Sequence, residues 1–244
     1  KISFLNFDCM NRLKTKLKSL FHAQFARRVT ILAAGTAIGQ GIMLLAAPAL
    51  TRLYSSADFG VLAVFTSALG ILAVLATLRY EEAIPLPQKD EDAFSLLVLS
   101  FSILLIVSML LGLGVWLAGD STLALLKIAQ LKPYAWLLPL ALFGMSAYQI
   151  LNYWAVRKAA FREIGVTKIT QGLALAVTQI AIGLFHKTPL GLVLGDFAGR
   201  VAGSGMLFKV FRKSNLNLKQ SLSHAAIQTQ ARAYWKFPAF TLPN

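Results

Sequence analysis

The chain has 244 residues, of which 57% are hydrophobic and only 14% are charged, and its mean hydropathy is +0.64. Soluble domains are about 45–50% apolar and about 25% charged, so a globule of this size would lack the polar residues to cover its surface. The formal net charge of +14 would favour nucleic acid as a partner of a soluble protein, but here the positive charge is split among short segments between apolar runs. The composition therefore excludes a soluble nucleic-acid-binding protein and indicates lipid as the solvent of most of the chain.

Cysteine and histidine give no sign of a metal or redox centre. Cys9 is the only cysteine, so no internal disulfide can form, and His22, His186 and His224 include no ligand pair at helical spacing. We expect neither a metal nor a cofactor.

Six apolar segments are long enough, or nearly so, to cross a hydrocarbon layer of about 30 Å. They run over residues 29–50, 59–78, 94–117, 135–156, 167–185 and 190–210. In lipid every backbone amide must be paired within its own segment, so these segments are helices rather than open strands. The sequence predicts an all-α polytopic membrane bundle of about six transmembrane helices.

The charged segments divide the chain and set its orientation. We predict a basic amphipathic cytoplasmic segment over 1–28, a six-helix transmembrane lobe over 29–210, and a cytoplasmic linker with the start of a seventh helix over 211–244. Most of the 24 Lys and Arg residues lie before the first crossing, in the second and fourth loops, and in the tail. The opposite loops hold only Arg52, Lys127, Lys132 and Lys187. By the positive-inside rule, both termini face the cytoplasm.

The basic segment also has an apolar face. Leucines and phenylalanines recur at three- and four-residue steps between Leu13 and Phe25, among three lysines. This pattern is typical of a helix that lies on an anionic membrane surface. It predicts either an anchor or gate, or a collar that orients the first crossing.

The segment 190–210 carries a stripe of small residues at every fourth position, which lets another helix approach closely. The stripe consists of Gly191, Gly195, Gly199 and Gly203. Asp196 and Arg200 flank it, four residues apart and with the acid toward the amino end. Charges within a membrane helix cost about 2.5–3.5 kcal/mol each on insertion scales and often mark pathways. Two interpretations stay open: a self-neutralising pair that holds the bundle together, or a cavity charge that binds an anionic headgroup, with the acid holding it or taking a proton.

Uncharged polar residues lie within several helices and share faces in the fourth and fifth. They are Gln40, Ser146, Gln149, Asn152, Tyr153, Thr167, Gln171, Thr178 and Gln179. Such residues either hydrogen-bond between helices or line a wet cavity. Together they predict a hydroxyl- and amide-lined cavity between the fourth, fifth and sixth helices, as a sugar would require.

Two further arginines stand at helix ends, Arg52 on the outer side and Arg79 on the inner side. A guanidinium group donates two parallel hydrogen bonds to a phosphate. Arg52, Arg79 and Arg200 are therefore candidate headgroup contacts, although each of the first two can equally be an interfacial anchor.

Two loops resemble the signatures of a known family. Residues 50–60 (LTRLYSSADFG) are similar to the first-loop signature of polysaccharide-biosynthesis flippases, and residues 78–87 (LRYEEAIPLP) to the second. Residues 234–244 resemble the start of their seventh helix. The chain thus looks like the amino-terminal half of the O-antigen and capsule-repeat flippases of the MATE-like oligosaccharidyl-lipid superfamily.

The resemblance implies a two-lobe transporter, of which this chain would form one lobe, and no enzyme. The implied activity moves undecaprenyl-diphosphate-linked oligosaccharides from the cytoplasmic to the outer leaflet of the bacterial inner membrane, for O-antigen, capsule or exopolysaccharide. The implied partners are membrane lipid, the lipid-linked glycan, a polysaccharide polymerase and a chain-length regulator. Coupling to an ion gradient would need a titratable carboxylate, and Asp196 is the only one deep in a predicted helix.

Other functions remain as alternatives. A peptidoglycan-precursor flippase is close to the first reading, whereas the arginine-bearing loops argue against a MATE-type ion-coupled exporter. A non-transporting membrane scaffold belongs to a third class. A membrane glycosyltransferase would need catalytic acids in a sizeable outer loop, and the predicted outer loops are short. Asp90, Glu91 and Asp92 fit an acidic metal-binding pattern, but at a helix start they are typical of a solvated cap.

Overall fold

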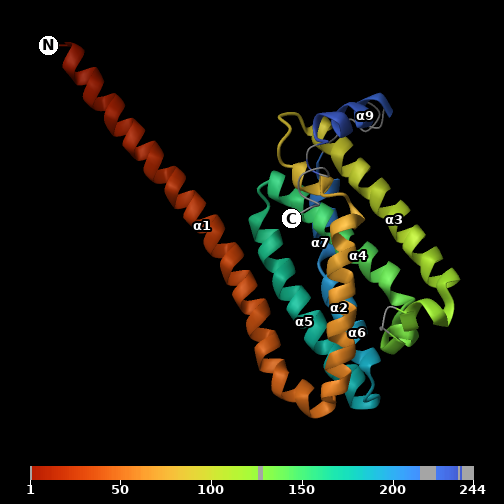
Figure 1. The fold of residues 1–244 in the computed structure, drawn as a ribbon. Helices are drawn as coiled ribbons and strands as arrows, with labels where there is room; N and C mark the ends of the chain where they lie inside the picture. Colours follow the sequence, from red (N-terminus) through yellow and green to blue (C-terminus); the bar gives the residue numbers. More distant parts are fainter. Residues whose placement is uncertain (1, 126–128, 215–223, 236, 238–244) are drawn as a thin grey trace.

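The computed structural model describes residues 2–125, 129–214, 224–235 and 237, and its elements in these ranges are all helical. In chain order they are α1 (Ile2–Leu53), α2 (Ser56–Ala76), η1 (Tyr80–Ala83), α3 (Asp90–Leu125), η2 (Ala129–Tyr134), α4 (Leu137–Arg157), α5 (Phe161–Phe185), α6 (Pro189–Val201), α7 (Ser204–Arg212) and α9 (His224–Ala233). Figure 1 shows them gathered into one bundle from which α1 projects. The predicted all-α fold class is confirmed.

Four helices are long and apolar enough to cross a membrane: Ala26–Leu53 within α1, α2, Asp90–Leu117 within α3, and α5. The chain is therefore a membrane protein. α4 has 21 residues but carries four amide or hydroxyl side chains in its second half, and α6 has only 13 residues. Whether α4 and the α6–α7 pair complete the six predicted crossings stays a prediction.

The sixth predicted segment is not one helix, which corrects the expectation for 190–210. Ala202 is extended, with ψ 135°, and Gly203 has φ +87°, a region that residues with a side chain rarely adopt. A Cβ atom at Gly203 would also lie 2.6 Å from Cβ of Thr167. Gly203 is thus the turn residue between α6 and α7, rather than the last member of a continuous stripe.

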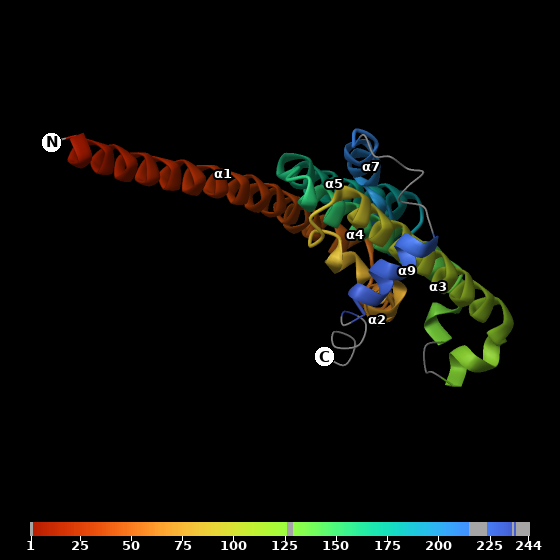
Figure 2. The same cartoon turned by 90° about the horizontal axis from the view of Figure 1, so that it is seen from above.

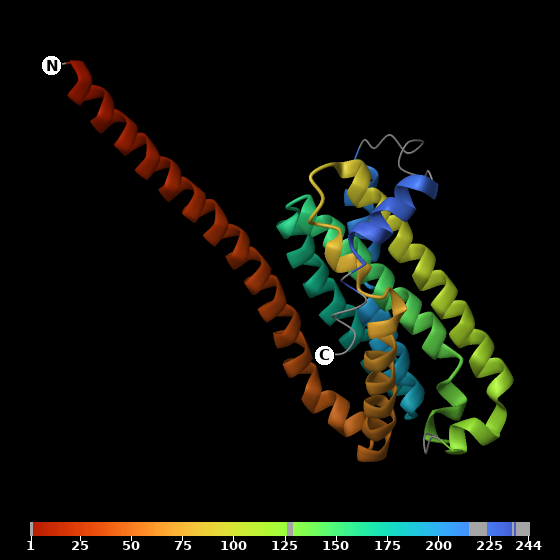
Figure 3. The same cartoon turned by 45° about the horizontal axis from the view of Figure 1, so that its top comes forward.

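The boundary predicted near residue 28 has no counterpart as a break in the backbone. α1 is a single helix of 52 residues, and Figures 1 and 3 show its amino-terminal part extending away from the bundle. The basic segment and the first crossing thus form one continuous helix, and the membrane-surface role of the segment stays a prediction. The side chains of residues 1–25, on which the amphipathic interpretation rests, lie outside the described residues.

Helix α5 is packed between α1 and α6 through glycines. Gly35 and Gly39 of α1 lie against Gly165 and Gly172 of α5. A Cβ atom at Gly39 would be 2.5 Å from the carbonyl oxygen of Lys168, and one at Gly172 would be 2.5 Å from the carbonyl oxygen of Gly39. The two backbones are in direct contact, as small residues permit between membrane helices.

The glycines of α6 face the other side of α5. A Cβ atom at Gly195 would overlap the side chain of Gln179, and one at Gly199 would lie 2.7 Å from Cβ of Leu175. Gly191 lies against the Tyr54 ring, whose hydroxyl donates a hydrogen bond to the carbonyl oxygen of Gln179 at 2.7 Å. This close contact brings Asp196 and Arg200, on the next face of α6, toward the interior.

Gly172→Ala is expected to destabilise the protein by about 1–3 kcal/mol, because the added methyl group meets backbone that cannot move aside. Gly41→Ala is the matched control, since a Cβ atom there meets nothing within 4 Å and alanine is the better helix former by up to about 1 kcal/mol. Thermal unfolding in detergent checks both. Equal unfolding temperatures for the two variants would contradict the glycine contact.

α3, α4 and α7 pack around a group of aromatic side chains at the end of the bundle that carries η1. Phe211 of α7 stacks on Phe94 of α3, with ring centroids 5.9 Å apart, and meets Trp154 of α4 edge-on at 5.8 Å. α9 lies across the start of α3, where Gln230 donates a hydrogen bond to Asp92 at 2.9 Å. The predicted seventh helix falls mostly on residues 236 and 238–244, which lie outside the described residues.

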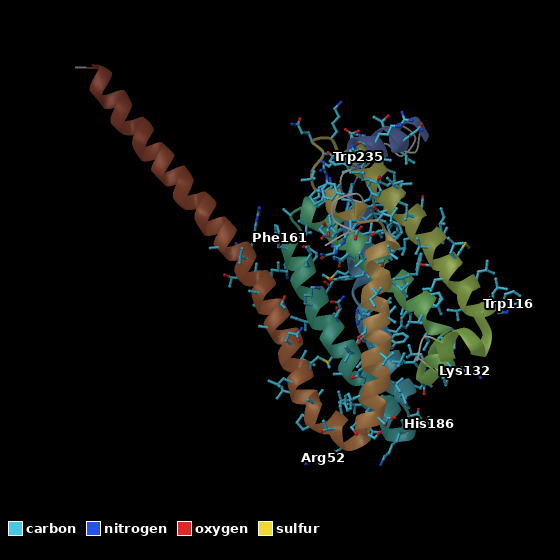
Figure 4. All side chains as sticks on the ribbon, viewed as in Figure 1. Arg52, Trp116, Lys132, Phe161, His186 and Trp235 are labelled. Carbon is cyan, nitrogen blue, oxygen red and sulfur yellow. The ribbon has the colours of Figure 1, made fainter. Side chains whose placement is uncertain are left out.

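Loops alternate between the two ends of the bundle. Figure 4 places Arg52, Lys132 and His186 at one end, and Phe161 and Trp235 at the other. This alternation agrees with the order of loops that the hydropathy pattern predicts.

Candidate functional site

A cavity of about 650 Å³ lies between α1, α2, η1, α4, α5 and α6. Polar and charged residues make up much of its wall: Thr36, Gln40, Arg79, Glu81, Glu82, Ser146, Tyr148, Gln149, Tyr153, Lys168, Gln171, Asp196 and Arg200. The predicted walls from the fourth, fifth and sixth segments are present. α1, α2 and η1 also line the cavity, which the sequence analysis had placed between the fourth, fifth and sixth helices only.

The structure brings six of the predicted site residues together at this cavity: Gln40, Arg79, Gln149, Gln171, Asp196 and Arg200. Ser146, Gln149 and Tyr153, which share one face of α4, all line it. Arg52, Asn152 and Gln179 do not line it, nor do Thr167 and Thr178.

The excluded candidates have other environments. Gln179 is buried and donates a hydrogen bond to the carbonyl oxygen of Leu192 at 3.1 Å, so it joins α5 to α6. Arg52 is exposed at the far end of the bundle from η1 (Figure 4). Asn152 lies on α4 outside the lining, and its buried Oδ1 has no hydrogen-bond partner among the described residues. Sequence spacing could not separate these positions, because it shows which residues share a face but not what that face meets.

Asp196 and Arg200 form an ion pair within α6, with Nε of Arg200 2.6 Å from Oδ2 of Asp196. Another guanidinium nitrogen, Nη1, lies 2.8 Å from the sulfur of Met145. The side chains are 29% exposed for Arg200 and 11% for Asp196. Asp196 is thus held by Arg200, while the partly exposed Arg200 side chain still lines the cavity.

Lys168 is a cavity residue that the sequence analysis missed. It lies in the first turns of α5. The sequence analysis used it only as one of the positive charges that set the membrane topology. Its Nζ lies 5.1 Å from the centre of the Tyr148 ring, a cation–π contact. No ion pair holds it in the part of the chain that the structure describes, so it is the cavity cation with no carboxylate partner there.

The two residues before η1 have a left-handed backbone conformation, which is unusual for residues with a side chain. Leu78 and Arg79 both have positive φ, 51° and 61°, at a cost of about 1–2 kcal/mol each for residues with a side chain. This turn points Arg79 at the cavity, where its Nη1 lies 2.5 Å from Glu82. Its Nε is buried without a partner among the described residues. Strained residues persist where the surroundings fix them, and such sites are often functional.

Arg157, at the end of α4, fixes this segment and was also missed. Its Nε lies 2.9 Å from Asp90, and its Nη1 donates a hydrogen bond of 2.6 Å to the carbonyl oxygen of Pro87. Lys158 pairs with the same carboxylate at 2.5 Å. Asp90 is therefore more than the solvated cap expected, because it ties the start of α3 to the end of α4. No group of three metal-ligating side chains lies in the described ranges.

Glu81 is a buried carboxylate of the cavity with no ion-pair partner within the described residues. The residue is 6% exposed, and its Oε2 accepts no hydrogen bond within the described residues. Burial raises the pKa of Glu81 above its usual range and outweighs the opposing hydrogen bonds from Thr77 and the backbone; the smaller charge effects are Glu82, which raises the pKa, and Arg79, which lowers it. Burial thus favours the protonated form of Glu81.

A family model described as "polysaccharide biosynthesis protein" matches residues 49–228, about three quarters of the chain. The chain belongs to the polysaccharide biosynthesis protein family. The match covers every wall of the cavity except the α1 wall. No curated protein and no solved structure matches the chain significantly.

The first-loop motif of this family member has a local structural role. Ser55 and Asp58 form a capping box at the start of α2: Oγ of Ser55 accepts from the Asp58 amide at 3.3 Å, and the Asp58 carboxylate accepts from the Ser55 amide at 2.8 Å. The motif therefore sets the sharp turn between α1 and α2. The second-loop motif, in contrast, supplies Arg79, Glu81 and Glu82 to the cavity.

The raised pKa of Glu81 gives a testable dependence of stability on pH. The native state binds a proton that the unfolded state has already lost, so stability is greatest below the unfolded pKa of the carboxyl group and falls as pH rises through the folded pKa. Glu81→Gln is expected to flatten this fall. The check is thermal unfolding in detergent between about pH 4 and pH 8, with the exposed Glu91→Gln as control. A profile that Glu81→Gln leaves unchanged would contradict the effect of burial on this carboxyl group.

Proposed function

We propose that this family member moves lipid-linked oligosaccharide units across the bacterial cytoplasmic membrane, from the inner to the outer leaflet, for surface polysaccharide synthesis. The observation that carries the proposal is the cavity between the helices, which combines three cations with a wall of amide and hydroxyl groups. Membership of the polysaccharide biosynthesis family supports the same class of substrate.

The position of the cavity fits loading from the cytoplasm. Its lining runs from the middle of the bundle toward the end that carries η1: residues 70–74 of α2, 145–153 of α4, 168–175 of α5 and 196–200 of α6. The basic loops lie at this same end, which the positive-inside rule assigns to the cytoplasm. In the proposed topology both termini are cytoplasmic and the cavity opens inward, toward the leaflet in which the substrate is assembled.

The chemistry of the wall suits a glycan attached to a diphosphate. Arg79, Lys168 and Arg200 offer charged donors to the phosphates, whereas Gln40, Gln149 and Gln171 offer both donors and acceptors to sugar hydroxyls. A wet cavity removes the cost of carrying these polar groups through hydrocarbon, and the lipid tail stays in the bilayer. No bond is made or broken, so we propose a transporter rather than an enzyme.

The test measures the substrate in the native host after deletion of the full-length gene. Radiolabelled lipid-linked glycans are quantified together with surface polysaccharide, and the deletion is complemented with the unaltered gene. We expect complete repeat units to accumulate on the lipid carrier while surface polymer is lost, and both effects to be reversed by complementation. Unchanged precursors with normal surface polymer would overturn the proposal, and truncated glycans would place the protein in assembly rather than in transport.

A further inference from the structure

A second cavity of about 550 Å³ lies at the η1 end of the bundle, between the end of α4, the start of α5 and α7. Its lining is Lys158, Ala160, Glu163, Met206, Lys209, Val210, Lys213 and Ser214. None of these residues lines the first cavity. The second cavity is therefore a separate feature that the proposed transport does not use.

The charges of this cavity are predominantly positive. Lys209 and Lys213 lie four residues apart, on one face at the end of α7, and no ion pair holds either one in the described part of the chain. Lys158 is held by Asp90 and lies over the Trp154 ring at 5.3 Å. Glu163 is the acid in the lining, so a positive charge remains after it is balanced against one of the free lysines.

Helix α7 holds these lysines on a fixed support. Its opposite face carries Leu207, which is fully buried, and Phe211, which is packed against Phe94 and Trp154. Met206 and Val210 give the cavity an apolar wall directly before the lysines. An ammonium pair next to apolar surface matches a molecule with an anionic head and a hydrocarbon tail.

The location of α7 favours a ligand from the membrane. Figure 2 shows α7 beside α5 at the edge of the bundle, on the side away from α2. Phe208, on the same helix, is 49% exposed. α5 begins at this cavity with Phe161, and its N-cap residue Ala160 makes no side-chain cap, so the positive end of the helix adds to the attraction for an anion.

We propose that this cavity binds the phosphate group of an anionic phospholipid in the cytoplasmic leaflet, held by Lys209 and Lys213. The acyl chains would lie along the apolar surface of α7, which joins the headgroup site to the bilayer. The same phosphate chemistry is offered by soluble phosphate, and the experiment distinguishes the two sources. The proposal does not depend on the transport function, because lipid binding can be measured without substrate.

The experiment measures thermal unfolding of the purified protein in neutral detergent at 150 mM NaCl. Phosphatidylglycerol, phosphatidylcholine and inorganic phosphate are titrated separately. We expect phosphatidylglycerol to raise the unfolding temperature more than phosphatidylcholine does, and inorganic phosphate to have no effect. The double variant Lys209→Gln/Lys213→Gln is expected to weaken the apparent affinity for phosphatidylglycerol about 30-fold, since each lysine near an anionic surface contributes about a factor of five.

The matched control is Lys89→Gln/Lys187→Gln, which removes two positive charges at exposed positions outside both cavities. It is expected to keep the phosphatidylglycerol response. An equal loss in the control would show that the net charge, not the cavity, attracts the lipid, and would overturn the proposal. Stabilisation by inorganic phosphate alone would overturn the lipid source. The unfolding temperatures without lipid establish that both double variants fold.

Discussion

The double variant Asp196→Asn/Arg200→Gln is expected to fold nearly as stably as the unaltered protein and yet to translocate lipid-linked glycan at least about tenfold more slowly. The single variant Arg200→Gln leaves the carboxylate of Asp196, which is 11% exposed, without its partner. Breaking a buried pair costs about 3–5 kcal/mol, and the 29% exposure of Arg200 places this pair near the lower limit. Replacing both charges removes that penalty, because no unpaired charge remains.

This comparison separates the two roles that the pair can have. If the pair only holds the bundle together, the double variant recovers translocation together with stability. If the guanidinium binds the diphosphate, stability returns and translocation does not, because a hydrogen bond to a charged group worth about 1.5–3 kcal/mol is lost. Thermal unfolding in detergent and the initial rate of translocation in proteoliposomes measure the two properties separately. Full recovery of the rate in the double variant would contradict a role of Arg200 in substrate binding.

Lys168→Gln is expected to lower the translocation rate by roughly ten- to hundredfold without loss of stability. The reason is that the ammonium group has no carboxylate partner in the described ranges and contacts the Tyr148 ring at the cavity wall. Removing this charge leaves no carboxylate without its partner and loses only the cation–π contact with Tyr148, so the unfolding temperature is expected to change little. Lys168→Arg keeps the charge and is expected to restore most of the rate.

Lys187→Gln is the matched control for Lys168, since Lys187 is exposed in the turn between α5 and α6 and lines neither cavity. Its translocation rate is expected to equal that of the unaltered protein. The experiment uses the same proteoliposomes with a labelled lipid-linked glycan. A Lys168→Gln variant with an unaltered rate would remove Lys168 from the binding site and leave Arg79 and Arg200 as its cations.

The sequence analysis identified part of the site because helical spacing is a local property. Ser146, Gln149 and Tyr153 recur at steps of three and four, and all three line the cavity. Gln179 has the same chemical character but faces α6, where it bonds to a carbonyl oxygen. Periodicity gives the face of a helix, whereas its partner depends on the rotation of the helix in the bundle.

The glycine pattern gives a second example. The stripe in α6 was visible because its members repeat every fourth residue, and these glycines do pack closely on α5. The contact between Gly39 and Gly172 was not predicted, because each glycine is unremarkable within its own helix and the two are far apart in the sequence. The break at Gly203 was also missed, since a glycine fits both a packing face and a turn with positive φ.

Hydropathy and local motifs were enough to establish the class of the protein: a helical membrane bundle, the order of its loops, and the polysaccharide biosynthesis family. These follow from hydropathy, charge and short motifs, which are properties of neighbouring residues. Which charges from different helices meet had to come from the three-dimensional packing: Arg157 pairs with Asp90, whereas Lys168 and Glu81 have no charged partner at hydrogen-bonding distance in the described residues. The physical reason is that the energy of a charge depends on what surrounds it in space, and those surroundings come from helices far apart along the chain.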